Sequence, residues 1–450
     1  MLHSGTRQKV TTQTSPGHSG RTGSSAVLRS SGAASIGGGA LQRPASNASC
    51  SASSAVNHSQ SRSGLAKRAS TGGRPSHRSK PGRTSAKCSE QLRENKHIVI
   101  VGAGIVGAST AYYSSKKGAR VTVIDQVGPA CHSSGKAAGF LAVGWNSGPL
   151  EDLAKASFAL HQELAREFGP NTLGFRAMTS LGLGFGGETP EGGRPWLDKT
   201  GSIVHYTMGT QSTNAQVHPR KLTEALLEHS GAQFIKGTVV GIEAEGNRVV
   251  SLLFKSGECI RCDSVVFAMG PWSMQLTQWF PRLEKLLRDT VGRKYTSVVY
   301  DTVCDDAYGT YVSLENYHIA INSRPDEVYA CGCPSKADLP NDPLEIQADA
   351  EHVKLIQEEV SSVSTQLGEA TVKVHQACFL PSSEDSQPVI GRIPEMSNAY
   401  VACGHTCWGI LNGPATGKAV AELIMDGKAT YVDLSAFDPG REPKEVCVIQ

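Results

Sequence analysis

The spacing of apolar residues changes at residue 96, and from there on it predicts alternating strands and helices. His97–Val101 (HIVIV) is a continuous β-branched run, typical of a parallel strand that is buried on both faces. A glycine-rich turn and a helix-like stretch, 108–117, follow it, and Arg120–Asp125 (RVTVID) then predicts a second strand. This order of strand, helix and strand implies a right-handed crossover in a doubly wound sheet.

The same reading extends along the rest of the chain. Apolar residues at positions 153, 156, 160 and 164 predict an amphipathic helix over 150–168. Further helices are predicted at 221–229, 349–367 and 415–425, whereas short β-rich runs between 291 and 333 predict an antiparallel sheet. The predicted fold class is therefore α/β: a Rossmann-type doubly wound sheet with an interleaved antiparallel-sheet domain.

Composition separates the first part of the chain from this folded part. Residues 1–89 contain 21 Ser, 12 Gly and 13 Lys+Arg but no acidic residue. The remainder holds 31 basic and 41 acidic residues, a net charge of −10, which excludes a basic nucleic-acid-binding core. Because residues 1–95 offer too little apolar surface to offset the entropy of ordering, we predict a disordered tail there.

The two ends of the chain suggest different locations. An acid-free, Ser- and Arg-rich tail is typical of plastid and mitochondrial transit peptides, although an extension without a targeting role is the alternative and would leave the protein in the cytoplasm. The chain ends in Cys447-Val-Ile-Gln450, which fits a farnesylation box and predicts weak membrane anchoring through Cys447. The two signals conflict, because cytosolic prenyltransferase cannot reach an imported protein. No apolar run approaches the ~20 residues of a transmembrane helix.

The cysteines do not predict a metal site or a disulfide framework. Cys259 with Cys262, and Cys331 with Cys333, are close in sequence, but the two pairs are far apart and lack histidines at a suitable spacing. We interpret them as buried or half-buried free thiols. The irregular spacing of all the cysteines argues against a secreted, disulfide-bonded fold.

The glycine-rich turn predicts a dinucleotide site. Gly102 allows a tight turn after the first strand, Gly104 lets the backbone approach a pyrophosphate, and Gly107 lets the helix pack closely on the strand. The phosphates would lie at the helix N-terminus, where free N–H groups and the helix dipole favour negative charge. Asp125, at the end of the second strand, is placed to bind a ribose hydroxyl.

Two distant segments favour FAD over NAD. Residues 265–273 form an apolar strand that enters a glycine turn, and residues 403–422 repeat the order of strand, Gly-rich turn and helix. These segments would present backbone N–H groups to the flavin end of the cofactor, where negative charge develops near N1 and C2=O. An NAD-dependent dehydrogenase is the alternative, and it requires 381–424 to be purely structural. NADP is disfavoured by the acid at the second strand.

Several ordered motifs resemble the D-amino acid oxidase, glycine oxidase and sarcosine oxidase (DAO) superfamily of FAD-dependent oxidoreductases, within it the yeast Tda3-like type of fungi and plants. The motifs are HIVIVGAGIVGASTAYYSSKKGARVTVID, HSSGKAAGF, VHPRKLTEALLEHSGAQFIKGTVVGIE, SVVFAMGPWS and a stretch that contains GHTCWGILNGPATGKAVAELI. The resemblance covers 96–438 and leaves 439–450 as a C-terminal tail. It implies an FAD subdomain over 96–170, 211–290 and 371–438, and a substrate subdomain over 171–210 and 291–370.

The resemblance also implies site residues. The residues that it implies for FAD binding are Gly102, Gly104, Ile105, Val106, Gly107, Asp125, Ser133, Ser134, Lys136, Ala137, Val239, Gly270, Gly404, His405, Gly409 and Ile410. The family usually has Glu where this chain has Asp125. His405 and Trp408 are the candidate catalytic residues, and structural packing of their turn is the alternative. Tyr311 and Tyr317 are further candidates for the substrate side.

Two positions near the last motif bear on substrate and cofactor. Amino-acid-oxidising relatives often have an Arg that binds the substrate carboxylate where this chain has Leu380, so Lys294 or Arg324 would have to take that role here. Cys378 resembles the cysteine that carries covalent flavin in the sarcosine oxidase branch. Cys378 is thus the candidate for covalent attachment of the flavin, and a chance match in position is the alternative.

These features predict an FAD-dependent oxidoreductase that oxidises a small amine or amino-acid-like substrate. Hydride would pass from the carbon beside the nitrogen to flavin N5, and O₂ or another acceptor would reoxidise the flavin. The alternative is an FAD-binding protein of assembly, trafficking or regulation with little or no catalysis, which the missing carboxylate anchor at Leu380 favours.

Overall fold

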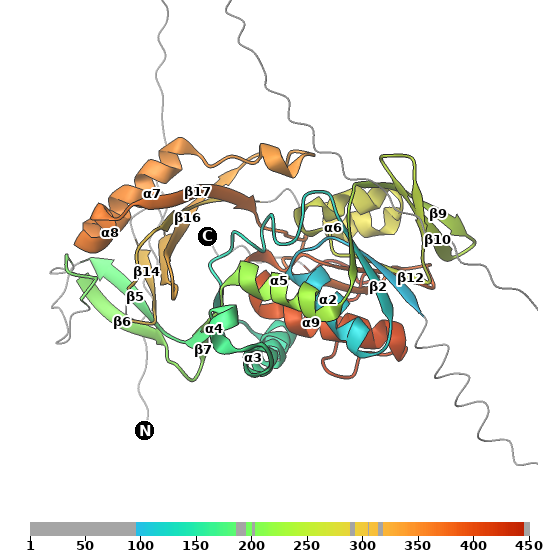
Figure 1. The fold of residues 1–450 in the computed structure, drawn as a ribbon, viewed down its shortest axis with the longest axis horizontal. Coiled ribbons are helices and arrows are strands. Elements are labelled where there is room, and N and C mark those ends of the chain that lie inside the picture. The colour runs from blue at the N-terminus through green and yellow to red at the C-terminus, as the bar shows by residue number, and fades with distance from the viewer. Residues whose placement is uncertain are drawn as a thin grey trace, which may run out of the picture. The chain divides into compact units, whose positions relative to one another are not determined.

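The computed structural model describes residues 96–185, 195–199, 203–288, 293–304, 306–313 and 318–444. The predicted N-terminal tail, Tyr317 and Cys447 lie outside these residues. Two sheets organise the described chain, and the chain passes between them several times (Figure 1). Within this part of the chain, none of the helices combines the length and the apolar character needed to cross a membrane.

The first sheet has six strands and contains the predicted βαβ unit. Its order is β18-β19-β12-β1-β2-β8, and every neighbouring pair is parallel except β18 with β19. The strands are β1 (His97–Val101), β2 (Arg120–Asp125), β8 (Gln233–Lys236), β12 (Ser264–Phe267), β18 (Val389–Arg392) and β19 (Ala399–Cys403). Both predicted strands of the βαβ unit are confirmed with their bounds.

Alternating side chains of β1 explain why this sheet is covered on both faces. Ile98 and Ile100 pack into one buried cluster with helical residues, whereas Val99 and Val101 pack into another cluster with residues of a second, smaller sheet. A strand with no polar face needs such a double cover, because either face left in water would expose apolar surface.

Helices cover one face of this sheet. They are α2 (Ile105–Lys116), α3 (Gly148–Phe168), α5 (Pro219–Ser230) and α9 (Gly409–Met425), with α2 in contact with both α5 and α9 (Figure 1). The other face is covered by a three-stranded sheet and short helical turns. These are β9 (Val239–Glu245), β10 (Arg248–Phe254), β11 (Cys259–Arg261), η1 (Gly270–Gln278), η2 (Pro281–Leu283) and α6 (Glu284–Leu287).

The second large sheet has seven strands in the order β17-β13-β16-β15-β14-β5-β6. Its strands are β5 (Thr179–Phe185), β6 (Ile203–Gly209), β13 (Arg293–Tyr300), β14 (Tyr308–Ser313), β15 (His318–Ser323), β16 (Val328–Lys336) and β17 (Val372–Phe379). Helices α7 (Ala350–Val363) and α8 (Thr365–Glu369) pack on its outer face (Figure 1). The predicted antiparallel pairing holds throughout except between β14 and β5, which are parallel.

Smaller elements complete the described chain. They are β3 (Phe140–Ala142), α4 (Pro170–Leu173), β4 (Arg176–Ala177), β7 (Asn214–Gln216), η3 (Pro343–Glu345), η4 (Thr406–Trp408) and η5 (Ser435–Phe437). Strands β3, β7 and β4 form a third small sheet.

Three boundaries drawn from the sequence are wrong. The helix predicted over 349–367 is two helices, because the Ser364 side chain accepts the N–H of Leu367 and starts a new helix. The predicted boundary at 371 assigns β17 to the FAD subdomain, but β17 pairs with β13 and so belongs to the seven-stranded sheet. The last helix begins at Gly409 rather than at 415, although Gly413 and Pro414 lie inside it.

Helix α9 tolerates its proline because α3 replaces the lost hydrogen bonds. Pro414 has no N–H to donate to the carbonyl of Ile410. His161 of α3 supplies its Nε2, which lies 3.0 Å from the Ile410 oxygen and 3.1 Å from the Leu411 oxygen. Burial lowers the pKa of His161 to about 4, so the ring is neutral and Nε2 carries its proton toward the two carbonyls. Sequence periodicity cannot show this, because the donor lies about 250 residues away.

We expect His161→Leu to lower the free energy of unfolding by about 2 kcal/mol, because it leaves two buried carbonyls of α9 without a donor. Urea denaturation followed by circular dichroism measures this loss. The matched control is Gln162→Leu, at the neighbouring exposed position of α3, which should change stability by less than about 0.5 kcal/mol. Equal effects of the two substitutions would contradict this role of His161.

Candidate active site

Two adjoining cavities lie at the carboxyl ends of the parallel strands, the usual ligand position in such sheets. The first cavity is lined by the ends of β1, β2 and β12. The second cavity extends to the inner face of the seven-stranded sheet. The two share five lining residues: Gly104, Ser133, Ser134, Ala268 and Gly270. They therefore form one continuous site that a long ligand can span.

The glycine turn after β1 is too tight for any side chain. A Cβ on Gly102 would lie 2.2 Å from the Ala268 oxygen, and the φ of this residue is +110°. A Cβ on Gly107 would lie 1.9 Å from the Gly102 oxygen, so the helix packs directly on the turn. At Gly104 a Cβ would lie 2.9 Å from Oγ of Ser134, a residue that lines both cavities. The turn thus presents bare backbone to the site.

Helix α2 points its N-terminus at the place where the cavities meet. Its N-cap, Gly104, offers no side chain to the first turn, and the first turn contains no acidic residue. The Ile105 N–H donates to Oγ of Ser134 at 2.9 Å. The positive end of the helix dipole therefore faces the site without an acidic residue in its own first turn.

Asp125 lines the first cavity and organises the turn beside it. Its Oδ2 accepts the N–H of Ala103 at 3.0 Å. Its Oδ1 accepts the N–H groups of Val127 and Gly128 at 2.9 and 3.0 Å. The carboxylate thus links the glycine turn to the loop after β2, a structural role in addition to the predicted contact with a ribose.

A second helix N-terminus approaches from the other side. Helix α9 begins after the turn 404–408, in which Gly404 and Thr406 have φ values of +78° and +50°. Its first turn also lacks a capping side chain and an acidic residue. His405, Thr406, Cys407, Gly409 and Ile410 line the second cavity. The N-terminus of α9 therefore faces the far end of the site.

His405 is buried and neutral. It is 3% exposed, and its Nε2 lies 3.0 Å from Oγ1 of Thr416 on α9. Burial lowers its pKa to about 4. A general base works best with a pKa near the working pH, so this environment suits a positioning residue better than a proton acceptor.

Residues 133–138, here called the crossing loop, run past both cavities and are held by the seven-stranded sheet. The Ser133 hydroxyl donates to the Phe379 oxygen at 2.7 Å, and Nζ of Lys136 donates to the Ala377 oxygen at 2.9 Å. From the sheet side, the Tyr329 hydroxyl donates to the Lys136 oxygen at 2.9 Å. The crossing loop therefore follows β2 of the six-stranded sheet along the chain, but its hydrogen bonds are to β16 and β17 of the seven-stranded sheet.

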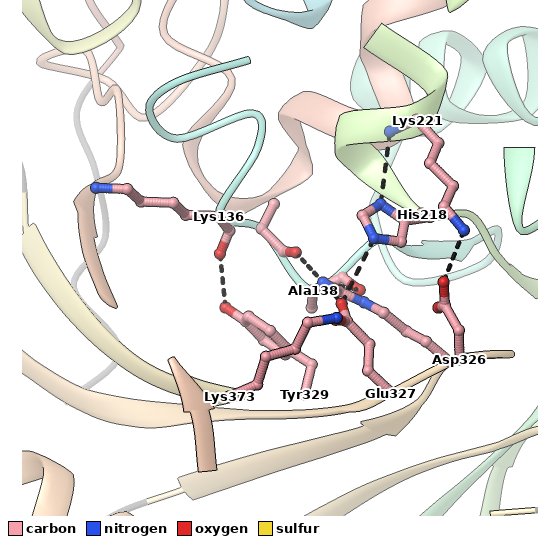
Figure 2. Close-up of polar contacts among 10 residues, drawn as sticks. Lys136, Ala138, His218, Lys221, Asp326, Glu327, Tyr329 and Lys373 are labelled. Carbon is pink, nitrogen blue, oxygen red and sulfur yellow. Dashed lines mark hydrogen bonds and ion pairs between the residues drawn. The ribbon is translucent and has the colours of Figure 1, made fainter. Parts of the chain in front are cut away.

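A buried ion network lies behind this loop (Figure 2). Arg324 donates Nη2 to the Ala137 oxygen at 2.5 Å and Nη1 to Oε1 of Glu327 at 2.6 Å. Oε2 of Glu327 accepts Nζ of Lys373 at 2.9 Å, and Nε2 of His218 lies 3.5 Å from Oε1. Burial raises the pKa of Glu327, but bonds from His218 and Lys373 and the charge of Arg324 outweigh it and hold the pKa well below its usual range.

His218, Asp326 and Glu327 place ligand atoms within 4.8 Å of one another, as a metal site would require. Each carboxylate already pairs with protein cations, however. Asp326 pairs with Lys221 at 2.7 Å and Glu327 with Lys373 (Figure 2). Glu327 also pairs with Arg324. An added divalent cation would face these positive groups at short range. The cluster is therefore better described as an ion network than as a metal centre.

The inner face of the seven-stranded sheet forms the remaining wall of the second cavity. Tyr295, Tyr329, Cys331 and Cys378 line it from β13, β16 and β17, and Leu380 follows β17. Burial raises the pKa of the Cys378 thiol to about 12, so the thiolate needed for attachment to a flavin is scarce. Covalent flavin at Cys378 stays a prediction, and the protonated thiol counts against it.

Trp408 belongs to a cluster of four half-buried aromatic rings that joins the two sheets. This aromatic cluster consists of Phe140, Trp145, Tyr311 and Trp408. Ring centroids lie 5.2 Å apart for Phe140 and Trp145, 5.6 Å for Trp145 and Tyr311, and 6.2 Å for Trp145 and Trp408. Tyr311 lies within electrostatic reach of Cys331 and Cys407, which line the second cavity, although none of the four rings belongs to that lining.

Comparison with known proteins is consistent with this geometry. The family model "FAD dependent oxidoreductase" matches residues 97–423. The chain belongs to this family of FAD-dependent oxidoreductases. "Putative oxidoreductase C1F5.03c" of Schizosaccharomyces pombe is 29% identical to this chain, over 77% of this chain and 99% of its own length. "Putative oxidoreductase TDA3" of Saccharomyces cerevisiae is 24% identical, over 78% of this chain and 95% of its own length. The crystal structure of a glycine oxidase from Bacillus cereus shares the fold, with a TM-score of 0.62 at 22% identity over 74% and 96% of the chains.

The residues present fit the FAD that this family binds. The bare glycine turn and the N-terminus of α2 suit the pyrophosphate, and Asp125 lies where the adenosine ribose would be bound. The N-terminus of α9 suits the pyrimidine end of the flavin, where negative charge develops on reduction. The continuity of the two cavities gives FAD room between these ends.

Most of the predicted FAD-binding residues line one or both cavities. The residues that do so are Gly102, Gly104, Ile105, Val106, Asp125, Ser133, Ser134, Ala137, Val239, Gly270, His405, Gly409 and Ile410. Three of the predicted residues are absent from both linings: Gly107, Lys136 and Gly404. Gly107 lets α2 pack on the glycine turn, Lys136 binds the Ala377 oxygen, and Gly404 adopts the positive φ of the turn before α9.

Sequence reasoning missed the residues that tertiary packing brings into the site. His132 and Trp272 form an edge-to-face pair at 4.7 Å in the first cavity. Tyr295, Tyr329 and Cys331 enter the second cavity from strands whose inward face could not be known from alternation alone. The β-rich runs between 291 and 333 were the only available signal.

We expect Asp125→Asn to weaken FAD binding by roughly tenfold or more, because one amide oxygen cannot replace two carboxylate oxygens that accept three N–H groups. Titration of the apoprotein with FAD measures the dissociation constant. Asp152→Asn, on the exposed side of α3, is the control and should leave FAD binding unchanged. Unaltered affinity in Asp125→Asn would show that the carboxylate is not required.

We expect Glu327→Gln to destabilise the protein by about 3 kcal/mol at pH 7, since Arg324 and Lys373 lose their anion. Because the pKa of Glu327 is lowered on folding, its contribution is complete above the ordinary glutamate pKa and is lost as the pH falls through the acid range. The difference from the wild type should therefore shrink in acid.

Urea denaturation of both proteins between pH 7 and pH 3 measures this difference. The control is Glu358→Gln, whose pair with Lys354 is 3.6 Å long and mostly exposed, and which should cost less than about 0.5 kcal/mol. A pH-independent difference for Glu327→Gln would mean that the substitution acts through packing rather than charge.

Proposed function

We propose that this protein oxidises a small amine or amino-acid-like substrate at the carbon beside the nitrogen. The observation that carries the proposal is the second cavity, which joins the FAD site to the inner face of the seven-stranded sheet. A protein that held FAD only as a structural element would have no need for this space beyond the cofactor. The similarity in fold to the glycine oxidase of Bacillus cereus supports an amine substrate.

The reaction is a two-electron oxidation. Bound FAD would accept the hydride of the substrate C–H bond at N5 while the nitrogen lone pair forms a C=N bond, and O₂ or another acceptor would later take the two electrons. Water then adds to the C=N bond and releases a carbonyl compound and the amine that remains. The protein residues must hold the C–H bond beside the cofactor, keep the amine neutral and exclude bulk water.

The described residues suit these tasks. The described lining of the second cavity contains no Asp, Glu, Lys or Arg and is largely apolar, which favours the neutral form of a bound amine, because an apolar surrounding penalises charge. Burial raises the pKa of Tyr311, so its hydroxyl stays protonated and can donate a hydrogen bond. We assign His405 to positioning of the α9 turn and Trp408, through the aromatic cluster, to the margin of the substrate space.

Anaerobic mixing of the FAD-bound protein with amines tests this proposal. We expect at least one member of a panel of glycine, sarcosine, D-alanine, benzylamine and N-methylbenzylamine to bleach the flavin absorbance. A complete lack of bleaching, in a protein whose flavin dithionite still reduces, would contradict the proposal and favour an FAD-binding protein of assembly, trafficking or regulation.

A matched pair of variants tests whether reduction takes place in the second cavity. Cys331→Phe fills that cavity and should slow flavin reduction at least about tenfold while FAD stays bound. Cys259→Phe makes the same change on the exposed strand β11 and should leave the rate unchanged.

A further inference from the structure

The wall of the second cavity carries no charged side chain among the residues that the structure describes. Beyond the FAD side, its lining consists of tyrosines, cysteines, Leu380 and Pro381. His405 is the one lining residue with a basic side chain in that described set, and its lowered pKa of about 4 leaves it neutral. An anionic substrate group would therefore be desolvated there without a charged partner, which is costly.

The two nearest cations of the crossing loop and its support, Lys136 and Arg324, are absent from the described lining of the second cavity. Both terminal nitrogens of Arg324 are bonded, Nη1 to Glu327 and Nη2 to the Ala137 and Ala138 oxygens, and its guanidinium stacks on the Tyr329 ring at 4.6 Å. Nζ of Lys136 donates to the Ala377 oxygen. Neither residue belongs to the lining, so neither offers a free two-pronged site to a carboxylate.

Lys294 faces away from the cavity. It precedes Tyr295 on β13, and Tyr295 lines the cavity, so alternation sends the Lys294 side chain to the opposite face. Asp349, at the start of α7 on that outer face, lies within the electrostatic reach of Lys294. Neither cation that the sequence suggested as a replacement anchor, Lys294 or Arg324, is available for that role.

The thiols of the wall are apolar as well. Burial raises the pKa of Cys331 to about 11 and that of Cys378 to about 12, so both are protonated at neutral pH. Cys407, whose pKa burial also raises, completes the wall beside the aromatic cluster. Protonated thiols pack as small hydrophobic groups, and the neighbouring rings offer flat apolar faces.

We propose that the site oxidises amines with an apolar, aryl-bearing body and no carboxylate, bound against the wall of the seven-stranded sheet that its cysteines and the rings of Tyr295 and Tyr329 form. This inference rests on the proposed amine oxidation and narrows its substrate class. The apolar wall takes the place of an ionic anchor. Burial of the aryl group supplies the free energy of binding, and a carboxylate on the same substrate opposes binding because it would be desolvated without a cationic partner.

Matched substrate pairs test the inference. N-methylbenzylamine and N-methylphenylglycine share the aryl group and the methylated nitrogen and differ only in the carboxylate; benzylamine and phenylglycine form a second pair. Stopped-flow bleaching of the bound flavin under anaerobic conditions gives the reduction rate constant divided by the dissociation constant of each. We expect each carboxylate-free member to exceed its partner by at least about 100-fold.

The outcomes separate this inference from the function on which it rests. Equal or faster reduction by the carboxylated members, or by glycine and sarcosine, overturns the substrate class while it upholds amine oxidation. No reduction by any amine, with a flavin that dithionite still bleaches, overturns the function and this inference together.

A gain of charge provides a second measurement. Leu380 lines the cavity, so Leu380→Arg places a cation where the wall has none. We expect the preference for the carboxylate-free member to fall at least about tenfold in this variant. Leu380→Met, similar in size and neutral, should keep the preference, and bound FAD in both variants shows that they are folded. An unchanged preference in an FAD-bound Leu380→Arg protein would contradict the neutral-wall explanation.

Discussion

The crossing loop 133–138 is the constraint on which both halves of the site depend. Its hydroxyl at Ser134 accepts the first N–H of α2, and the loop lines both cavities. Yet Tyr329 and Arg324 of the opposite sheet hold its backbone carbonyls. Because the same few residues contact the FAD site on one side and the substrate wall on the other, a shift of the second sheet would move the cofactor site as well. The geometry of a hydride transfer needs such a fixed relation.

Charge is distributed unevenly around this loop. The strong ion pairs of Glu327 lie behind it, where Arg324 and Lys373 neutralise the carboxylate and His218 adds a further polar contact. The cavity in front is lined by protonated thiols, tyrosines and aliphatic residues. The network can therefore hold the two sheets together without placing a charge where an amine has to be neutral. The penalty of desolvating these ions is offset by their mutual contacts, away from the chemistry.

Close packing of helices α2 and α9 brings two N-termini to one site. Gly413 leaves room for Ile105, whose Cγ1 would lie 2.6 Å from an added Cβ, and Gly417 does the same for Ser109. Two helices can approach this closely only where side chains are absent. The positive ends of both dipoles then reach the cavities, one where the pyrophosphate of FAD would lie and the other at the pyrimidine end of the flavin. His161 keeps the start of α9 helical despite Pro414.

The local part of this structure follows from the sequence. The apolar run of β1, the glycines at 102, 104 and 107 and the acid at 125 act over a few residues, so a parallel sheet and a dinucleotide turn could be predicted from them. The family resemblance added the FAD residues at the turn before α9. The prediction from short-range patterns was wrong at Gly413 and Pro414. These residues favour a turn but lie inside α9, where His161 of α3 replaces the missing hydrogen bond.

Only the tertiary structure decided which faces of β13, β16 and β17 meet the cofactor. Alternation shows that Lys294 and Tyr295 point to opposite faces, but not which one is inside, because helix α7 and the FAD site come from other parts of the chain. The position of Arg324 was equally hidden, since its partners are backbone carbonyls nearly 190 residues away. The sequence thus determined that this protein binds a dinucleotide in a doubly wound sheet. Long-range packing decided that the described residues of the wall opposite the FAD site carry no charged side chain.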